Sequence, residues 1–489
     1  MDKTVGNQNG YYGYFYERSD GEEFVPYGRD VRIANIYKNI DDSILKFKLK
    51  YIYANKTCYF DIKRSEAFEW NGFAKMRAVG IDLPSNQALS VFTEYLSAQE
   101  EAYFDNDDII YFHTNIGWMK IGANWAYKHY KSHGFMETYT DSESLEEHAI
   151  ELTSKYDGTL DIKPKGKIDN YCEFLKTEVL CYTPAQAALI MGLSAVICSL
   201  LQTKLDIGNP IIHLYGDSSI GKTTAAQLAV SAAGNPTVKG DSLMKTWSGT
   251  LNAIITRLAG WNGVPVAFDE ISKCYEQDLS GVVYALSDGR DKDRLTKEGT
   301  LKGVEPFSVV IISTGESSLF QKCRENTGLK VRMIEFNTPF TMDAEHSERI
   351  KEGCKNYHGK LAPMLASYII KKSSVSQLAD NFEDWKDKFK TYLESKTSSV
   401  DSFQNRISNY YALFILTAEL ANRILKKYDV KFDIEALMNF FADNEIKNNS
   451  NRDIADIAYE KVIEYINKNS AHFYRVSMVN GNTTVSTAS

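Results

Sequence analysis

The sequence lacks the cysteine patterns that stabilise small secreted domains and zinc modules. Its seven cysteines are scattered, and no two of them form a C-x-x-C pair or a Cys/His zinc spacing. The chain also opens without a signal-peptide pattern. An odd number of cysteines in such a chain points to reduced thiols, so we expect a cytoplasmic protein without a structural zinc centre.

Long apolar runs are equally scarce. The most apolar stretch, residues 185–201, lies at the short limit for a membrane span and contains Gln186 and Ser194. We therefore expect a buried helix at this place and no membrane partner.

Positive charge is not in excess either. The chain has 56 lysines and arginines against 64 aspartates and glutamates, which gives a formal net charge of −8. The net charge therefore gives no indication of nucleic-acid binding, and any such contact must come from a local cluster of basic residues. The length of 489 residues allows about two to four domains, and no internal repeat is present.

The pattern of apolar residues predicts an α/β protein with four regions. Residues 1–150 are β-rich, with expected strands at 11–16, 44–54 and 109–114 and a helix at 86–98. Residues 151–205 form a helical connector, since 140–205 has a helical pattern interrupted by a polar loop at 157–167. Residues 206–340 alternate strand and helix, which predicts a parallel sheet. Residues 341–489 are mostly helical, for example at 408–427, with a polar tail that we expect to be an edge hairpin or disordered.

One motif in the third region has a specific chemistry. Residues 216–223 fit G-x-x-x-x-G-K-[ST], after an apolar run at 210–215 and before an Ala/Leu-rich segment at 224–233. This strand, loop and helix order is the context that a phosphate-binding P-loop, or Walker A motif, requires. The expected nucleotide-binding residues are Gly216, Asp217, Ser218, Ser219, Ile220, Gly221, Lys222, Thr223 and Thr224.

The geometry of such a loop explains its residue types. Glycines let successive backbone N–H groups point at phosphate oxygens, and the following helix adds its positive N-terminal end. Lys222 supplies a charge to the β- and γ-phosphates, and the Thr223 hydroxyl can ligand Mg²⁺. The sequence therefore predicts ATP and Mg²⁺ as cofactors.

Two acids follow a second apolar run. Residues 264–268 end in Asp269 and Glu270, the Walker B pattern. We expect Asp269 to hold the Mg²⁺ and Glu270 to activate the attacking water. The alternative is a strand followed by an acidic helix N-terminus, a common arrangement because acids favour that position.

A third apolar run, residues 307–312, ends in Ser313 and Thr314. In a parallel sheet the carboxyl ends of the strands share one edge, so these hydroxyls are expected beside the γ-phosphate in the role called sensor 1. Simple turn chemistry in Ser-Thr-Gly is the alternative.

Arg332 opens the predicted fourth core strand. In ring ATPases an arginine here faces the nucleotide of the neighbouring subunit, and we expect Arg332 to act as such a finger, with Arg324 as the second candidate. The alternative is a surface ion pair with Glu335 or Glu325.

A basic segment lies between the second and third apolar runs. Residues 290–302 carry five basic and three acidic side chains, and Lys297-Glu298-Gly299 is typical of a hairpin turn. A hairpin with a lysine at its tip suits a pore loop that contacts a sugar-phosphate backbone. The expected DNA-binding residues are Arg294, Lys297 and Lys302, and the alternative is a solvated charged hairpin.

The order of these motifs resembles the AAA+ class of ring ATPases. Within that class the chain resembles MCM-like, self-loading helicases of mobile genetic elements, a family that includes the staphylococcal cassette-chromosome helicases and pathogenicity-island replication initiators. The resemblance rests on residues 214–223, 268–270, 286–292 and 313–316, with weaker matches at 117–118 and 356–359. It implies a P-loop AAA+ core in a hexamer, and we expect the chain to end before the winged helix that many relatives carry.

The resemblance also implies a function. It predicts an ATP-driven hexameric DNA helicase that initiates replication of a mobile element, with single-stranded and origin DNA as partners. An AAA+ ATPase that remodels proteins is one alternative, for which residues 243–247 could supply an aromatic pore loop. An origin-binding factor without unwinding activity is another, and the intact Lys222, Asp269 and Glu270 argue against it.

Overall fold

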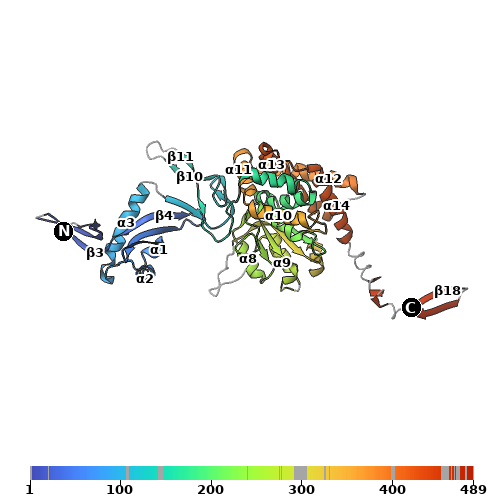
Figure 1. The fold of residues 1–489 in the computed structure, drawn as a ribbon, viewed down its shortest axis with the longest axis horizontal. Helices are drawn as coiled ribbons and strands as arrows, with labels where there is room; N and C mark the ends of the chain where they lie inside the picture. The colour runs from blue at the N-terminus through green and yellow to red at the C-terminus, as the bar shows by residue number, and fades with distance from the viewer. Residues whose placement is uncertain are drawn as a thin grey trace. The chain divides into compact units, whose positions relative to one another are not determined.

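The chain divides into two units, Met1–Thr159 and Leu160–Ser489, which are treated separately below (Figure 1). The structure is a computed structural model. It describes all residues except 1–2, 20, 106–108, 141–146, 239, 275, 277, 291–304, 324–326, 330, 398–401, 453–461, 464, 467, 470–473, 480–481 and 488–489.

The first unit is β-rich, as the sequence predicts. An antiparallel sheet contains β1 (Lys3–Gln8), β2 (Tyr11–Arg18) and β3 (Gly21–Arg29). A second sheet has the order β12-β7-β4-β5-β6, formed by β4 (Val31–Asn39), β5 (Leu45–Tyr53), β6 (Lys56–Lys63), β7 (Ile109–His113) and β12 (Lys155–Tyr156). Two antiparallel pairs complete the strands: β8 (Gly117–Ile121) with β9 (Asn124–Lys128), and β10 (Phe135–Thr140) with β11 (Glu147–Leu152).

Helices cover one face of the five-stranded sheet. The helical elements are α1 (Arg64–Ala67), α2 (Trp70–Ala78), η1 (Asn86–Ala88) and α3 (Leu89–Asp105). Alternate side chains of β5, namely Phe47, Leu49 and Tyr51, are buried in one core with residues of α2 and α3. The residues between them point to the other face, because successive side chains of a strand alternate.

The helical prediction for residues 140–156 is wrong, whereas residues 157–167 form a loop, as the sequence predicts. This segment contains β11 and β12, and the next helix along the chain begins only at Ile168. Glu147–Leu152 has the composition of a helix, but it pairs antiparallel with Phe135–Thr140. Pairing with a neighbouring strand has overridden the local propensity.

The second unit is built on a parallel sheet of strand order β17-β13-β16-β15-β14. The strands are β13 (Ile211–Tyr215), β14 (Met244–Thr246), β15 (Asn262–Asp269), β16 (Ser308–Gly315) and β17 (Met333–Phe336). Every residue of β16 is buried, as expected for a central parallel strand covered on both faces. The connections contain α7 (Lys222–Ser231), α8 (Leu251–Leu258), η3 (Ile271–Lys273), α9 (Ser280–Asp288), η4 (Leu319–Lys322) and η5 (Thr327–Leu329).

The apolar stretch at residues 185–201 is buried, as the sequence predicts. It forms α5 (Thr183–Leu193) and α6 (Ala195–Leu201), preceded by α4 (Ile168–Phe174) and the π-helical turn η2 (Leu175–Val179). Among the described helices none is long and apolar enough on its own to cross a membrane; α5 and α6 meet that criterion only as a pair, bent by 43°. Gly192 brings α5 onto α7, where a Cβ atom on Gly192 would lie 2.1 Å from the carbonyl oxygen of Ala229.

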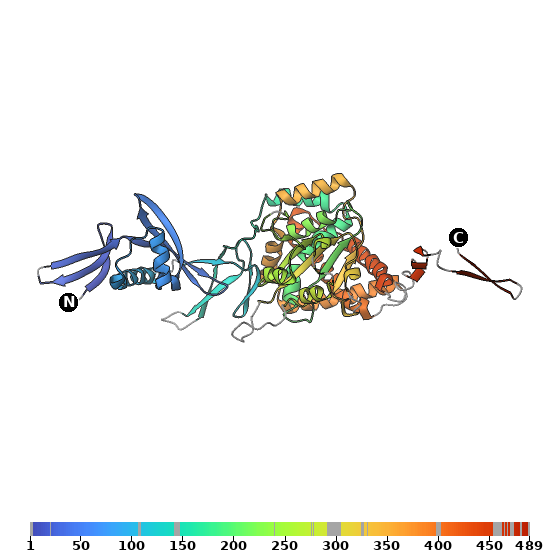
Figure 2. The ribbon, with the colours of Figure 1, turned by 90° about the horizontal axis from the view of Figure 1, so that it is seen from below.

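Helices dominate the rest of the second unit. They are α10 (Ala344–Asn356), α11 (Leu361–Lys372), α12 (Val375–Lys396), α13 (Ser402–Leu425), η6 (Lys426–Tyr428) and α14 (Ile434–Arg452). Within this unit helices enclose the strands (Figure 2). The tail contains one antiparallel pair, β18 (Tyr474–Val479) and β19 (Asn482–Thr487).

Candidate nucleotide site

Three neighbouring parallel strands end at one edge of the second sheet. β16 lies between β13 and β15, with Leu214 opposite Thr314 and Phe268 opposite Ser313. Strand order therefore places the residues that follow Tyr215, Phe268 and Ser313 side by side. Ligands of open parallel sheets bind outside such carboxyl ends.

The loop between β13 and α7 has the backbone of a phosphate-binding turn. Gly216, Ser219 and Gly221 have φ values of 125°, 72° and 81°, all in the left-handed region. A Cβ atom at Gly221 would lie 2.6 Å from the hydroxyl oxygen of Thr341, so this position also needs glycine for space. The loop leads directly into α7, whose N-terminal N–H groups face the same edge.

Lys222 is folded over this loop. Its Nζ donates to the carbonyl oxygens of Gly216 at 2.6 Å and Asp217 at 2.7 Å. The ammonium group is thus held at the loop by neutral acceptors, which phosphate oxygens can replace. The next residue but one, Thr224, is buried, and its hydroxyl contacts the Ser347 hydroxyl of α10 at 2.7 Å.

Asp269, at the end of β15, connects β16 with the first turn of α7. One of its carboxylate oxygens, Oδ1, accepts hydrogen bonds from the Thr223 hydroxyl at 3.0 Å and the Thr314 hydroxyl at 2.8 Å. The Thr314 oxygen in turn accepts the backbone N–H of Glu270 at 2.9 Å. The structure therefore brings Thr223, Asp269 and Thr314 into direct contact at the loop.

Glu270 has an unusual backbone and a local partner. Its φ of 63° is in the left-handed region, which is costly for a side chain of this size. Its carboxylate accepts the Ser272 hydroxyl at 2.7 Å and the Ser272 N–H at 3.3 Å. Partial burial alone would raise the pKa of Glu270, but these hydrogen bonds, with Lys273 and Lys222 nearby, keep it below its ordinary value.

Ser313 points away from this group and into a buried network. His213 Nε2 lies 2.9 Å from the carbonyl oxygen of Ser317, so Nε2 carries the proton and Nδ1 accepts the Ser313 hydroxyl at 2.9 Å. The indole N–H of Trp247 donates to the Ser313 oxygen at 3.1 Å. Burial lowers the pKa of His213 to about 4, so the imidazole is neutral at neutral pH.

A second anchor holds the chain that follows β16. The buried carboxylate of Glu335 accepts the Ser318 hydroxyl at 2.7 Å and the Leu319 N–H at 2.6 Å. Sequence reasoning missed Glu335, His213 and Trp247 as supports of this edge. Alternation along the strands could have assigned Ser313 and Thr314 to opposite faces, but the partners of Ser313 depend on strand order.

Arg332 lies at the other edge of the sheet. It precedes Met333, the first residue of β17, so it stands at the amino ends of the parallel strands, opposite the P-loop. Its guanidinium is 3.2 Å from the Asp288 carboxylate and 4.7 Å from the centre of the Tyr284 ring. Glu335 is not its partner among the described contacts, and Glu325 lies outside the described residues. The Nε atom is buried without an acceptor in the described part of the chain.

Several predicted residues fall outside the description. Arg294, Lys297 and Lys302, the expected DNA-binding residues, and Arg324, the second finger candidate, lie in residues that the structure does not describe. The flanks of the basic segment are described, and the Phe307 N–H donates to the Gly289 carbonyl oxygen at 3.0 Å.

The pore-loop interpretation of residues 243–247 is wrong. Met244–Thr246 forms β14, paired with β15, and the side chains of Leu243, Met244 and Trp247 are buried. A buried strand cannot present aromatic side chains to a translocating polypeptide.

The described residues suit a magnesium ion that is shared with phosphates. They contain no group of three or more His, Cys, Asp or Glu side chains that could hold a metal on its own. Mg²⁺ in phosphate-transfer sites needs only one or two protein oxygens besides phosphate and water. The Thr223 hydroxyl and the Asp269 carboxylate, 3.0 Å apart, match that requirement.

One comparison bears on the fold. The solved structure of "SCCmec type IV Cch - active helicase" superposes with a TM-score of 0.68 at 23% sequence identity, over 96% of this chain and 84% of that chain. At this identity the likeness shows a shared fold. No curated protein sequence matches the chain. The model of a family described as "Domain of unknown function (DUF927)" matches residues 6–305, and the chain therefore belongs to the DUF927 family.

Proposed function

We propose that this chain is an ATP-hydrolysing DNA helicase with an AAA+ core, which works as a hexamer on single-stranded DNA and initiates replication of a mobile element. The observation that carries the proposal is the contact of Thr223, Asp269 and Thr314 beside the P-loop. This arrangement supplies a hydroxyl and a carboxylate for a magnesium ion, which would neutralise phosphate charge when bound.

Each residue at this edge has a role in the proposal. Backbone N–H groups of the loop and the Lys222 ammonium bind the phosphates, and Lys222 exchanges its carbonyl acceptors for phosphate oxygens. Glu270 leaves Ser272 and orients the attacking water. Thr314, rather than Ser313, is the sensor 1 hydroxyl, because only Thr314 contacts Asp269.

Arg332 completes the proposal as a finger that acts on a neighbouring chain. It stands at the opposite edge of its own sheet, so it cannot reach its own P-loop. This position favours an assembly in which the amino edge of one sheet faces the carboxyl edge of the next. A ring of identical subunits repeats that contact.

DNA is favoured over protein as the substrate by two observations. The fold is similar to that of a protein described as an active helicase. The candidate aromatic pore loop for a protein remodeller is a buried strand. Protein remodelling remains the alternative that the experiment has to separate.

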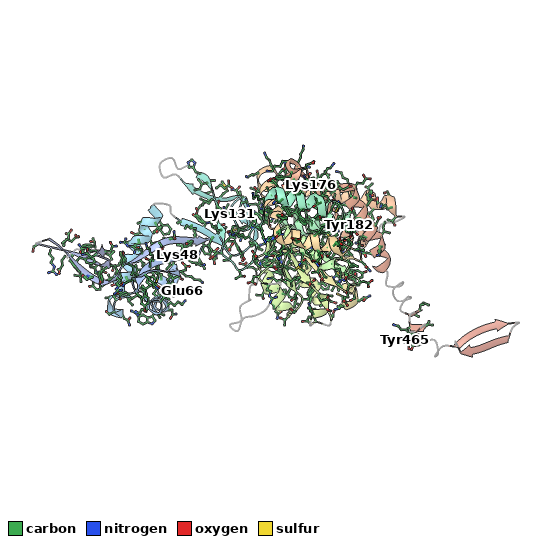
Figure 3. The ribbon with its side chains drawn as sticks, in the orientation of Figure 1. Lys48, Glu66, Lys131, Lys176, Tyr182 and Tyr465 are labelled. Atoms are coloured by element: carbon green, nitrogen blue, oxygen red, sulfur yellow. The ribbon has the colours of Figure 1, made fainter. Side chains whose placement is uncertain are left out.

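The test is ATP turnover with and without single-stranded DNA. Lys222→Ala should lower the rate about 100-fold or more, because a charged donor to the phosphates is lost. Lys176→Ala, which removes a partly exposed lysine of the same unit (labelled in Figure 3), should leave the rate unchanged. Single-stranded DNA should stimulate the wild-type rate. Full turnover in folded Lys222→Ala would refute the ATPase, and stimulation by unfolded protein but not DNA would favour the remodeller.

A further inference from the structure

The five-stranded sheet of the first unit has one face that the helices of this unit do not cover. Strands β4, β5 and β6 point their apolar side chains into the core with α2 and α3. The opposite face carries five cationic side chains together with two tyrosines. We call it the basic sheet face; its residues are Arg32, Lys46, Lys48, Lys50 and Lys63, with Tyr37 and Tyr59.

Strand register places these side chains in neighbouring rows. In the first row Lys46 lies between Tyr37 and Lys63, and in the third row Lys50 lies between Arg32 and Tyr59. Residues directly opposite on paired strands share a face of the sheet. The lysines of β5 are two residues apart, which spaces them by about 7 Å along the strand.

A middle row separates the two. In it Lys48 lies between Asn35 and Asp61. Asp61 is the one acid that the described register puts within these three rows. Figure 3 marks Lys48 on this sheet.

Three of the five cations on this face form no ion pair with a described carboxylate, although Asp61 lies opposite Lys48 in the strand register. Arg32 pairs with Asp30 at 2.6 Å and Lys46 with Asp157 at 3.4 Å. Within the described residues no carboxylate lies within ion-pair distance of Lys48, Lys50 or Lys63.

The pairing of β5 with β6 places two of these positive charges side by side, which destabilises the sheet when no ligand is bound. Lys46 lies directly opposite Lys63, and like charges in that position destabilise a sheet. An anionic ligand on the face would remove this repulsion.

Aromatic rings stand beside these cations. Tyr59 is 55% exposed, and the Lys48 ammonium lies 5.6 Å from the centre of its ring. The Tyr37 ring packs edge-on against Phe112 on the neighbouring strand β7. Aromatic rings beside lysines suit a single strand of nucleic acid, because its bases can stack on the rings while its phosphates contact the lysine ammonium groups.

We propose that the basic sheet face binds single-stranded DNA, as a contact separate from the ATPase edge and from the basic segment at residues 290–302. The proposal rests on the proposed function for the identity of its ligand. Lys48, Lys50 and Lys63 contact phosphates, and Tyr59 stacks on a base. This face presents no helix or two-stranded ribbon that could enter a duplex groove, so an unpaired strand fits it better than a duplex.

The experiment measures binding of a fluorescent oligothymidylate to the full chain without nucleotide, over a series of salt concentrations. The double variant Lys48→Gln/Lys50→Gln should reduce the slope of log affinity against log salt by about 1.4, since each phosphate contact on a single strand contributes about 0.7. Tyr59→Ala should weaken binding about five-fold or more with little change of slope, because it removes stacking and no charge.

The matched control is Lys131→Gln, an exposed lysine of the same unit that lies off the three strands (labelled in Figure 3). Its affinity and salt slope should equal those of the wild type. Folding of each variant is checked by its circular dichroism spectrum and its thermal unfolding midpoint, which should equal those of the wild type.

Wild-type affinity and slope in both face variants would overturn the proposal, and an acidic protein would then be the better ligand for this face. Equal losses in Lys131→Gln would overturn it too, since they would report only total charge. Failure of the proposed ATPase is a separate result, because it depends on Lys222→Ala turnover and not on DNA affinity.

Discussion

The two units treat their charged side chains in opposite ways. At the nucleotide edge Asp269 and Glu270 are bound by hydroxyl and N–H donors of the same chain, and Lys222 is bound by loop carbonyls. On the basic sheet face Lys48 and Lys50 have no such partner within the described residues. A catalytic edge needs fixed geometry before its ligand arrives, whereas a surface for a charged polymer needs excess charge.

A second difference is whether each site needs residues from a neighbouring subunit. The basic sheet face lies within one chain and needs no neighbour. The nucleotide edge has Lys222 as its cation, while Arg332 lies at the far edge of the same sheet. The proposed ATPase therefore depends on assembly, and binding of DNA to the face does not.

The largest expected effect tests this dependence. Arg332→Ala should lower the turnover number about 1,000-fold, as removal of an arginine finger does. Mixing it with Lys222→Ala subunits should restore part of the activity, because a mixed interface contains one intact site. ATPase assays of the single variants and their mixtures measure this.

The control for Arg332 is Arg349→Ala, which removes an arginine of the same unit that pairs with Glu178 at 2.8 Å. It should keep wild-type turnover. Loss without rescue, in variants that still assemble, would make Arg332 a structural partner of Asp288. If Arg324→Ala instead shows the loss and the rescue, the finger is Arg324.

A smaller effect concerns stability at acidic pH, and we expect both units to lose stability as the pH falls. Burial lowers the pKa of His113 in the first unit and of His213 in the second to about 4. The unfolded chain binds these protons near pH 6.5, so each contribution to stability is complete above pH 6.5 and is lost as the pH falls toward 4. Each histidine should make its unit about 2 kcal/mol less stable at pH 5 than at pH 7.

Hydrogen exchange followed by peptide can separate the units. His213→Gln should weaken the acid dependence of exchange in α7 and β16 and leave that of β5 and β7 unchanged. His113→Gln is the matched variant and should do the reverse. An unchanged acid dependence in both variants would show that other groups, chiefly carboxylates, control acid stability.

The smallest effect separates the two hydroxyls that end β16. Thr314→Val should lower turnover about ten-fold, because Asp269 loses a hydrogen bond to its charged oxygen. Ser313→Ala should leave turnover within about three-fold but lower the free energy of unfolding by about 1–3 kcal/mol, since Trp247 and His213 lose a buried partner. Steady-state ATPase assays and denaturant unfolding give both numbers. The reversed pattern would assign the sensor role to Ser313.

The sequence predicts those elements that depend on short stretches of neighbouring residues. The candidate P-loop at 216–223 and the strands ending at Asp269 and Thr314 are recognisable because short apolar runs and glycine spacing are local properties. Residues 147–152 were predicted as helix because their composition favours one, but β10 supplies a pairing partner. Partners on distant strands are invisible to such reasoning.

The same limit applies to the site. That Asp269 follows an apolar run is readable, but its contact with Thr223 and Thr314 requires β16 to lie between β13 and β15. The pairing of Glu270 with Ser272 depends on a left-handed backbone at a glutamate, which no propensity favours. The pairing of Arg332 with Asp288 depends on the packing of α9 beside β13 and η5.

The missing side chain of Gly192 has a mechanical consequence. Because Gly192 has no Cβ, the backbone of α5 packs directly on the backbone of α7 at Ala229, and a larger residue at 192 would push the two helices apart. Gln186 of α5 accepts the N–H of Asp433, the residue before α14, at 3.0 Å. These two contacts link the helix that follows the candidate phosphate loop to the start of α14, so in the proposed ATPase α5 lies between the nucleotide and the C-terminal helices.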